Sequence, residues 1–401
     1  MNPLHLSGYG VRIRVNKLAT RSELEIRNGR DDPTREYTSA FYRPHRLPYT
    51  SIIIDGHSGY ISLQAIHWLS RNNVPVFVSN FDGSVVSSIL PPMSIKADLR
   101  AAQLEASKNA IMTLNVARAL IEAKIARTIQ VLEWLKDRYD ISKDVALAKR
   151  EAMNLRRART VGAVRSVEGR VALKYWDAFG KALPEHLDFQ GRMTSSHQNN
   201  ATDPVNAALN YGYGFLEGEC RRAINAVGLE PSVGFLHDFS NYQTKQSLVY
   251  DLEEPFRWLV DLSVIQVFES KTLDLHDFYF TGDDYRYRFE HEAKVRFIET
   301  LRDRFNSGMK YKGRILKWDT VIEEKLNELA RYMNGRTPVL DFAEPAPILD
   351  DNRSVREAIL RLTQAEAKRR GIGKSTLHYL RKRVRTNQEF KVYSKVQSRL
   401  A

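Results

Sequence analysis

The sequence predicts an α+β protein in three parts: β-rich residues 1–92, mostly α-helical residues 93–335, and a C-terminal helix-turn-helix at 355–401 after a linker at 336–354. Short β-branched runs predict the first part, and long stretches with helical periodicity predict the second. A basic segment with a glycine turn between two amphipathic stretches predicts the third. A chain of 401 residues is long enough for two or three such domains.

Strands are predicted in the first part because short apolar runs alternate with turn signals such as DGHSG and FDGS. One helix, at 62–73, interrupts them, since its apolar residues recur at helical spacing and an Asn ends it. The predicted strands are 11–15, 23–28, 50–55, 74–79 and 84–90.

The second part is predicted to be helical from about residue 96, where an Ala- and Leu-rich stretch without Gly or Pro begins. The segment at 336–352 carries three prolines and four acidic residues, and this composition indicates a linker. The predicted helices lie within 96–157, with a separate one at 143–157, and at 161–180, 203–227, 247–268, 288–308 and 318–334.

Composition excludes several classes of protein. The one cysteine, Cys220, allows no internal disulfide framework, and no apolar run is long enough to cross a membrane. The N-terminus lacks the order of a signal peptide, so we expect a soluble cytoplasmic protein. No P-loop and no G-x-S-x-G motif occur, whereas spacing does not exclude a tyrosine nucleophile among the 18 tyrosines.

Positive charge is concentrated at the C-terminal end. The net charge is +13, and residues 353–401 hold 14 Lys or Arg against three Asp or Glu. A local excess of this kind indicates binding to a polyanion such as nucleic acid. The alternative is a disordered tail that improves solubility.

A helix-turn-helix is predicted within this basic segment. Thr363 and Glu366 form a capping box, and the GIG turn at 371–373 separates that helix from the next. The first residues of the second helix enter the major groove in such motifs, and later cations contact phosphates. The alternative is an amphipathic helical hairpin that packs on the main body. The base-edge candidates are Lys374, Ser375, Thr376 and His378, and the phosphate candidates are Arg381, Lys382, Arg383 and Arg385.

Acidic residues and one histidine in the helical part are candidates for a metal site. In the segment SLVYDLEEPFRWLVDL (247–262), Asp251 and Glu254 are three residues apart and share a helix face. Glu253 points about 100° away from Glu254, so Glu253 and Asp261 are predicted to be solvated. Glu168 and His237, each ordinary when taken alone, complete a set of carboxylates and one imidazole. This set suits Mg²⁺ or Mn²⁺, whereas a zinc site would need cysteine or a second nearby histidine.

Several spaced motifs resemble the CRISPR-associated integrase family, whose members insert new spacers. The motifs are E168-G-R followed by KYW, DPVNAALNYGYGFL (203–216), A-x-x-x-x-G-L-x-P-x-x-G-F-L-H (223–237), SLVYDLEEPFRWLVD (247–261) and the N-terminal run at 61–92. They occur in the family's order and cover about residues 1–330. His197 and the loop 238–246 depart from the commonest pattern of the family.

The resemblance implies a catalytic role for the helical part. It implies Mg²⁺ or Mn²⁺ bound by Glu168, His237 and Glu254, with Asp251 as a further required acid, and double-stranded DNA as the substrate. Arg165, Arg170 and Lys174 follow as candidates for phosphate contacts near Glu168, with plain surface solvation as the alternative. A prokaryotic source and a homo-oligomer on DNA, a dimer or larger, are also expected.

The basic C-terminal extension is similar to that of the casposases, transposases of self-synthesising mobile elements. This similarity favours an integrase that joins 3′-hydroxyl ends of a casposon to target DNA by transesterification. A CRISPR spacer-acquisition integrase or endonuclease is the first alternative. A non-catalytic helix-turn-helix regulator and a plain metal-dependent nuclease are the others.

Overall fold

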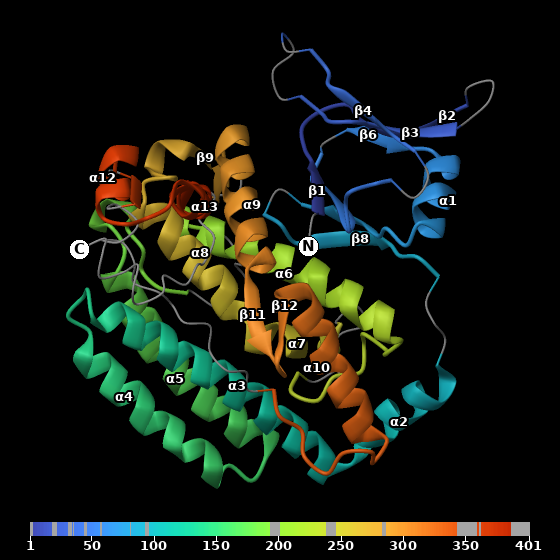
Figure 1. Cartoon of the computed structure of the whole chain (residues 1–401). Coiled ribbons are helices and arrows are strands. Elements are labelled where there is room, and N and C mark those ends of the chain that lie inside the picture. The colour runs from blue at the N-terminus through green and yellow to red at the C-terminus, as the bar shows by residue number, and fades with distance from the viewer. Residues whose placement is uncertain are drawn as a thin grey trace.

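The computed structural model has mixed α+β architecture, with sheets at the N-terminal end and a largely helical remainder (Figure 1). This confirms the predicted order of the first two parts. The structure describes residues 3–17, 22–30, 34, 36–43, 46–56, 58–80, 82–92, 96–192, 201–237, 246–282, 286–342, 359–360 and 362–385. Most of the predicted linker, His197 and nearly all of the loop 238–246 lie outside these ranges.

Two four-stranded sheets form the N-terminal part. The first has the order β1 (Pro3–Leu6), β5 (Ser51–Ile54), β7 (Val76–Ser79) and β8 (Val85–Ile89), and only the β7–β8 pair is antiparallel. The second has the order β4 (Ser39–Tyr42), β3 (Ser22–Arg27), β2 (Val11–Lys17) and β6 (Gly59–Ile61). All five predicted strands are confirmed, whereas β1, β4 and β6 were missed because runs of three or four residues carry little periodicity.

The two sheets and one helix share a small apolar core. Helix α1 (Leu63–Arg71) begins at Ser62, whose side chain accepts a hydrogen bond from the Ala65 backbone N–H at 3.1 Å. It contributes Ala65 and Leu69 to a cluster that also contains Ile13 of β2 and Ile52 of β5, all fully or almost fully buried. The predicted helix at 62–73 is therefore confirmed, and its apolar stripe closes the N-terminal core.

The helical part contains long helices around one large core. The predicted stretch at 96–157 is divided into separate helices. One division falls at Asn109, which caps the next helix by accepting hydrogen bonds from the backbone N–H groups of Ile111 and Met112. The helices are α2 (Ala97–Lys108), α3 (Ala110–Lys136), α4 (Ser142–Ala152), α5 (Val161–Lys181), α6 (Pro204–Val227), α7 (Ser247–Glu253), α8 (Arg257–Glu269), α9 (His291–Asn306) and α10 (Trp318–Met333).

Short 3-10 helices and two β-hairpins complete this part of the chain. The hairpins, which the sequence pattern did not reveal, pair β9 (Phe278–Thr281) with β10 (Arg286–Phe289) and β11 (Gly308–Tyr311) with β12 (Arg314–Lys317). The short helices are η1 (Met153–Arg157), η2 (Glu185–Leu187), η3 (Glu254–Phe256) and η4 (Leu275–Asp277). Of these, η3 joins α7 to α8 and carries one of the candidate metal ligands.

The N-terminal sheet meets the central helix α6 through two glycines in backbone contact. A Cβ atom added at Gly214 of α6 would lie 1.8 Å from the carbonyl oxygen of Gly83. Gly83 itself has a positive φ of 85°, and an added Cβ there would lie 2.7 Å from the Tyr211 Cα. Only hydrogen at both positions lets the two backbones approach this closely.

We expect Gly214→Ala to lower the free energy of unfolding by about 3 kcal/mol or more, since backbone must move to make room for the methyl group. Gly169→Ala on α5 is the matched control, because nothing lies within 4 Å of the added Cβ. There the better helix propensity of alanine should leave stability equal or raised by up to about 1 kcal/mol. Urea unfolding of both variants checks this, and equal midpoints would contradict the close contact.

A buried polar network also joins the sheet to the helices. Asp55, after β5, accepts a hydrogen bond from Lys294 Nζ of α9 at 2.7 Å and lies 3.3 Å from His5 Nε2. His5 Nε2 is 2.5 Å from the hydroxyl oxygen of Tyr211 on α6. Burial alone raises the pKa of Asp55, but attraction to His5 and Lys294 outweighs it and holds that pKa well below its ordinary 3.8.

This network predicts a specific sensitivity to acid. The pKa of Asp55 is lower in the folded chain than in the unfolded chain, so its contribution to stability is complete above about pH 4 and is lost as the pH falls toward the folded pKa. Asp55→Asn should therefore flatten the acid limb of the stability curve. Urea unfolding between about pH 7 and pH 2.5 measures it. Parallel curves for both proteins would show that Asp55 is not the responsible group.

The C-terminal segment forms two helices with their own apolar cluster. Helix α12 (Gln364–Arg369) begins with the predicted capping box of Thr363 and Glu366, and Gly371 takes a positive φ of 68° in the turn before α13 (Lys374–Arg385). The cluster comprises Ile359, Leu362, Ala367, Ile372, Leu377, Leu380 and Val384. The two helices and the turn are thus confirmed, whereas their use as a DNA-binding helix-turn-helix stays a prediction.

Candidate active site

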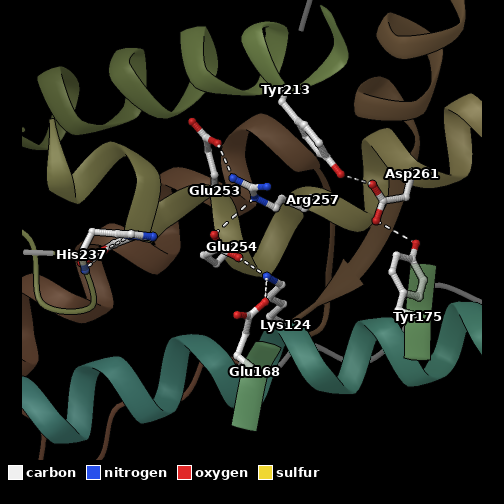
Figure 2. A network of polar contacts seen from close by, with 10 residues as sticks. Lys124, Glu168, Tyr175, Tyr213, His237, Glu253, Glu254, Arg257 and Asp261 are labelled. Atoms are coloured by element: carbon white, nitrogen blue, oxygen red, sulfur yellow. Dashed lines mark hydrogen bonds and ion pairs between the residues drawn. The ribbon is translucent and has the colours of Figure 1, made fainter. Parts of the chain in front are cut away.

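The four candidate residues of the metal site come from separate elements that converge in the helical part (Figure 2). Glu168 lies on α5, Glu254 on η3 and Asp251 on α7, while His237 ends the segment that follows α6. The structure brings them together as two pairs. Glu168 and Glu254 both contact Lys124, and His237 contacts Asp251 directly.

Glu168 and Glu254 converge on the ammonium group of Lys124, which lies on α3. Lys124 Nζ donates a hydrogen bond to Glu168 Oε1 and forms an ion pair with Glu254 Oε2 at 2.6 Å. The Glu254 carboxylate is almost fully buried, and its Oε2 has no partner in hydrogen-bond geometry among the described residues. Two carboxylates from different helices therefore face one cation.

Arg257 supports the other side of Glu254. Its Nε lies 3.4 Å from Glu254 Oε1, and its Nη2 lies 3.5 Å from Glu253 Oε2. Burial by itself raises the pKa of Glu254, but attraction to Arg257 and Lys124 outweighs it and lowers that pKa to about 2. Glu254 is thus ionised at neutral pH although it is buried, as a metal ligand has to be.

The prediction that Glu253 is solvated is wrong. Its side chain is buried, and burial, with the nearby charges of Glu217 and Glu254, raises its pKa well above 4.5. Burial therefore disfavours the charged form of Glu253, in contrast to the lowered pKa of Glu254. The cause is packing on several sides, since α7 packs against α6 and α3 and η3 packs against α3.

Asp251 holds the loop that carries His237. Its carboxylate, which is 0% exposed, accepts hydrogen bonds from the backbone N–H groups of Phe235 at 2.5 Å, Leu236 at 2.9 Å and His237 at 2.9 Å. A fourth contact, at 2.8 Å, joins it to Nδ1 of the His237 ring. With its oxygens occupied in this way, Asp251 positions the histidine rather than binding a metal directly.

The His237 ring is consequently fixed with one nitrogen available. Because Nδ1 contacts Asp251, that nitrogen carries the proton and Nε2 presents its lone pair. The side chain is 36% exposed. Figure 2 shows the ring beside Glu254. Imidazole oriented by a carboxylate is the usual arrangement of a metal-binding histidine.

Asp261 was also predicted to be solvated, and this prediction is wrong. Its buried carboxylate accepts hydrogen bonds from the hydroxyl groups of Tyr175 on α5, at 2.8 Å, and Tyr213 on α6, at 2.6 Å (Figure 2). Burial raises the pKa of Asp261, and the two hydroxyl donors offset part of this effect. The residue ties α8 to α5 and α6 behind the carboxylate pair.

A cavity of about 670 Å³ opens beside the carboxylate pair. Its walls carry Glu168, Glu254 and Lys124 together with four arginines, Arg127, Arg170, Arg192 and Arg257. Arg192 donates hydrogen bonds to the side-chain oxygens of two neutral amides on α6, Asn206 and Asn210, each at 2.9 Å. The cavity has the size of a ligand site, and its cations suit a phosphate-bearing substrate.

The donor set fits a hard divalent cation. Glu168 Oε1 and Glu254 Oε2 already meet at one positive charge, and the His237 ring, held through Nδ1, has Nε2 available. Two carboxylates and one imidazole suit Mg²⁺ or Mn²⁺. Within the described ranges, no three His, Cys, Asp or Glu side chains are close enough to hold an ion as they stand. The position between the carboxylates is held by Lys124.

The predicted phosphate contacts on α5 fall into surface ion pairs. Arg170 donates a hydrogen bond to Glu151 Oε2 at 2.9 Å, and Lys174 Nζ lies 3.5 Å from Asp177 Oδ2. Arg165 is exposed. Because exposed pairs of this kind contribute little, Arg170 and Lys174 remain able to exchange their partners for phosphates, and their DNA contacts stay predictions.

The predicted DNA contacts of α13 differ in how exposed their side chains are. Lys374, Ser375, Thr376, His378 and Lys382 are exposed, Arg383 is half-buried, and the Arg385 side chain lies outside the described part of the chain. Arg381 donates hydrogen bonds to the backbone carbonyl oxygens of Ile359, at 3.3 Å, and Leu362. The Arg381 guanidinium thus joins α13 to the segment before α12, and its contact with DNA phosphates stays a prediction. Tyr379, 53% exposed on the same helix, was not predicted.

Arg381→Ala and Lys382→Ala should therefore differ. We expect Arg381→Ala to leave two carbonyl groups without their donor and to unfold the α12–α13 unit at lower temperature. Lys382→Ala should keep this stability and weaken DNA binding with a smaller salt dependence. Limited proteolysis and DNA titrations at two salt concentrations measure both effects. A loss of salt dependence in Arg381→Ala without any change in proteolysis would contradict this assignment.

Sequence reasoning missed Lys124 and three of the four cavity arginines, Arg127, Arg192 and Arg257, whereas the fourth, Arg170, was a predicted phosphate contact. Arg257 lies three residues after Glu254, and that spacing was a usable signal. Lys124 lies on the apolar side of α3, one helical turn from the buried residues Leu120 and Ile121. A lysine on such a face is rarely buried unless it is paired, so its position indicated an acidic partner without identifying it.

Comparison with known proteins agrees with this fold. The family model described as "CRISPR associated protein Cas1" matches residues 33–303. A CRISPR-associated endonuclease Cas1 of Archaeoglobus fulgidus is 30% identical over 321 residues, which cover 75% of this chain and 90% of that protein. A Methanopyrus kandleri endonuclease Cas1 is 35% identical over 240 residues, 58% of this chain and 70% of the relative.

Solved structures extend the comparison. A casposase bound to integration product superposes with a TM-score of 0.82 at 35% identity, over 90% of this chain and 99% of that one. A Cas1 protein from Thermotoga maritima superposes with a TM-score of 0.68 at 16% identity, over 86% of this chain and 100% of that one, and shows likeness of fold alone. None of the described helices is long and apolar enough to span a membrane.

The N-terminal sheets, the helical remainder and the converging carboxylates define the class, that of the CRISPR-associated integrases and endonucleases. Within this class, the chain belongs to the Cas1 family, and a casposase is among the solved structures that it resembles.

Proposed function

We propose that this protein is a metal-dependent DNA integrase that joins the 3′-hydroxyl ends of a mobile element of the casposon type to target DNA. The observation that carries the proposal is the convergence of Glu168 and Glu254 on one cation, beside a histidine that Asp251 orients. The reaction is a transesterification. A new bond forms between the attacking 3′ oxygen and the target phosphorus, and the target's own P–O3′ bond breaks, so no water is consumed.

The residues of the chain have separate tasks in this reaction. Glu168 Oε1, Glu254 Oε2 and His237 Nε2 would hold one Mg²⁺ or Mn²⁺, which would make the hydroxyl more acidic and offset charge on the scissile phosphate. Asp251 fixes the imidazole and the backbone of residues 235–237. Arg257 keeps Glu254 ionised. The nucleophile belongs to the DNA, so no side chain has to act as one.

The cavity gives the DNA strand a place beside the carboxylates. Its arginines provide counter-charge for phosphates, and its volume admits a nucleotide-sized group. Holding the attacking hydroxyl and the target phosphate in line supplies much of the rate enhancement in phosphoryl transfer. We assign the cavity to this positioning.

The likeness to a casposase supports the casposon assignment. That solved protein is bound to integration product, and the likeness covers 90% of the present chain at 35% identity. Insertion into both strands of a target requires two active sites, so a homodimer or larger assembly on double-stranded DNA belongs to the proposal. The basic helices α12 and α13 would select the target or the element end.

A strand-transfer assay tests the proposal. The full-length protein is incubated with Mn²⁺, a labelled oligonucleotide carrying the element end, and supercoiled plasmid. We expect labelled plasmid in which oligonucleotide and target are covalently joined, and no such product with Glu168→Ala. Nicked plasmid without joining would indicate a plain nuclease, and DNA binding with neither product would indicate a regulator.

Spacer integration at a CRISPR array is a second candidate function, because the Archaeoglobus relative is a CRISPR-associated endonuclease and is matched over 90% of its length. Deleting residues 340–401 separates the two. A casposon integrase should lose its choice of target or element end when the basic helices are removed. Unchanged target choice, together with joining at a repeat sequence, would favour spacer acquisition.

A further inference from the structure

Lys124 combines features that are unusual for a lysine. It lies on α3, its side chain is 19% exposed, and its ammonium group contacts two carboxylates that come from α5 and η3. Burial lowers its pKa, but the charges of Glu254 and Glu168 outweigh this effect and raise it. Lys124 is therefore a charged amine that holds two distant elements at one point (Figure 2).

The two oxygens that Lys124 contacts, Glu168 Oε1 and Glu254 Oε2, are those assigned above to the divalent cation. An ammonium group and a metal ion cannot occupy the same position between them. We infer that Lys124 is an exchangeable counter-ion of the metal site: it neutralises and spaces the two carboxylates until a divalent cation displaces it. This inference rests on the proposed function only for the location of the cation.

Lys124 is suited to exchange, and Arg257 is not. Arg257 contacts the other oxygen of Glu254, reaches Glu253, and lies with its guanidinium carbon 4.7 Å from the centre of the Tyr213 ring. Such a stacked and forked guanidinium is held in place on several sides. Lysine carries a compact charge on a flexible stem, and the 670 Å³ cavity that it lines gives that stem room to move.

The exchange has two consequences for the site. Without the metal, the ammonium prevents repulsion between two converging carboxylates, one of them buried, and so preserves the shape of the site. With the metal bound, the released amine stays tethered at the cavity wall, where a substrate phosphate would become its new partner. Lys124 is thus a positioning residue for the carboxylates and a phosphate-contacting residue for the loaded site.

Calorimetric titration with Mn²⁺ tests the inference on the full-length protein without DNA. Lys124→Met removes the competing charge and keeps most of the stem, whereas Lys149→Met is the matched control. Lys149 also pairs with a carboxylate, Glu133, but its side chain is 53% exposed and lies outside the cavity. We expect Lys124→Met to bind Mn²⁺ about tenfold more tightly or better. The Lys149→Met affinity should equal that of the wild type.

Equal or weaker Mn²⁺ affinity in Lys124→Met would overturn the inference, since a purely structural lysine lowers affinity when it is removed. If this variant does not fold, amine acetylation of the wild type gives an independent answer by mass spectrometry. Saturating Mn²⁺ should raise labelling of Lys124 relative to Lys149, and unchanged labelling would count against exchange. Tighter Mn²⁺ binding by Lys124→Met, together with no strand transfer by the wild type, would support the counter-ion role and contradict only the proposed function.

Discussion

We expect Glu254→Gln to abolish strand transfer and Glu253→Gln to leave most of it. The two variants carry the same chemical change at adjacent residues. Glu254 has a pKa of about 2 and is ionised, so the amide removes a charge that a divalent cation requires. Burial raises the pKa of Glu253 well above 4.5 and so disfavours its charge, and glutamine replaces this side chain with nearly the same shape.

The two variants should differ greatly in the rate of joining. We expect Glu254→Gln to lower the rate of joining by about a thousandfold or more, which corresponds to about 4 kcal/mol of lost transition-state stabilisation. Glu253→Gln should stay within about threefold of the wild type. Single-turnover joining rates with saturating Mn²⁺ measure both. Similar losses in the two variants would mean that the carboxylates act together.

Asp251→Ala should damage both stability and activity, whereas His237→Ala should damage activity alone. Asp251 accepts three backbone N–H groups and the His237 ring in a buried position. Its removal leaves those donors unsatisfied, at a cost of about 3–5 kcal/mol in the free energy of unfolding. The half-exposed ring of His237 does not hold neighbouring backbone groups in this way, so its removal should cost little stability.

Thermal unfolding and joining rates of the two variants check this prediction. Asp251→Asn is a useful third variant, because it keeps the size of the side chain but presents at most one acceptor oxygen to four partners. We expect its stability to lie between those of Asp251→Ala and the wild type. A fully stable Asp251→Ala protein would show that the loop at 235–237 is held by other contacts.

Most of the fold could be predicted because its signals are local. Helical periodicity and the caps at Thr160, Asp203 and Thr363 act within a few residues, and the structure has helices beginning just after each of them. Strands of three or four residues, such as β6, and the two hairpins of the helical part carry too little pattern. Their formation depends on neighbours that are distant in the chain.

The candidate site was predictable only in part. Glu168, His237 and Glu254 stood out because their motifs resemble those of a known family. The state of Glu253 and Asp261 could not be read from a helix face, since Asp261 is buried by Tyr175 and Tyr213, which lie 86 and 48 residues away. Lys124 was missed for the same reason. A charged residue on an apolar face indicates a partner, but only tertiary structure identifies it.

The network of His5, Asp55, Tyr211 and Lys294 has a consequence for how the chain folds during synthesis. The strand that carries His5 and the strand that precedes Asp55 can pair early, because β1 and β5 leave the ribosome before α6 and α9. Their partners Tyr211 and Lys294 follow about 150 to 240 residues later. Contacts of such separation form slowly, and until they form the polar groups of the early sheet remain hydrated. Docking of the N-terminal sheets onto the helices is therefore a late event that awaits α9.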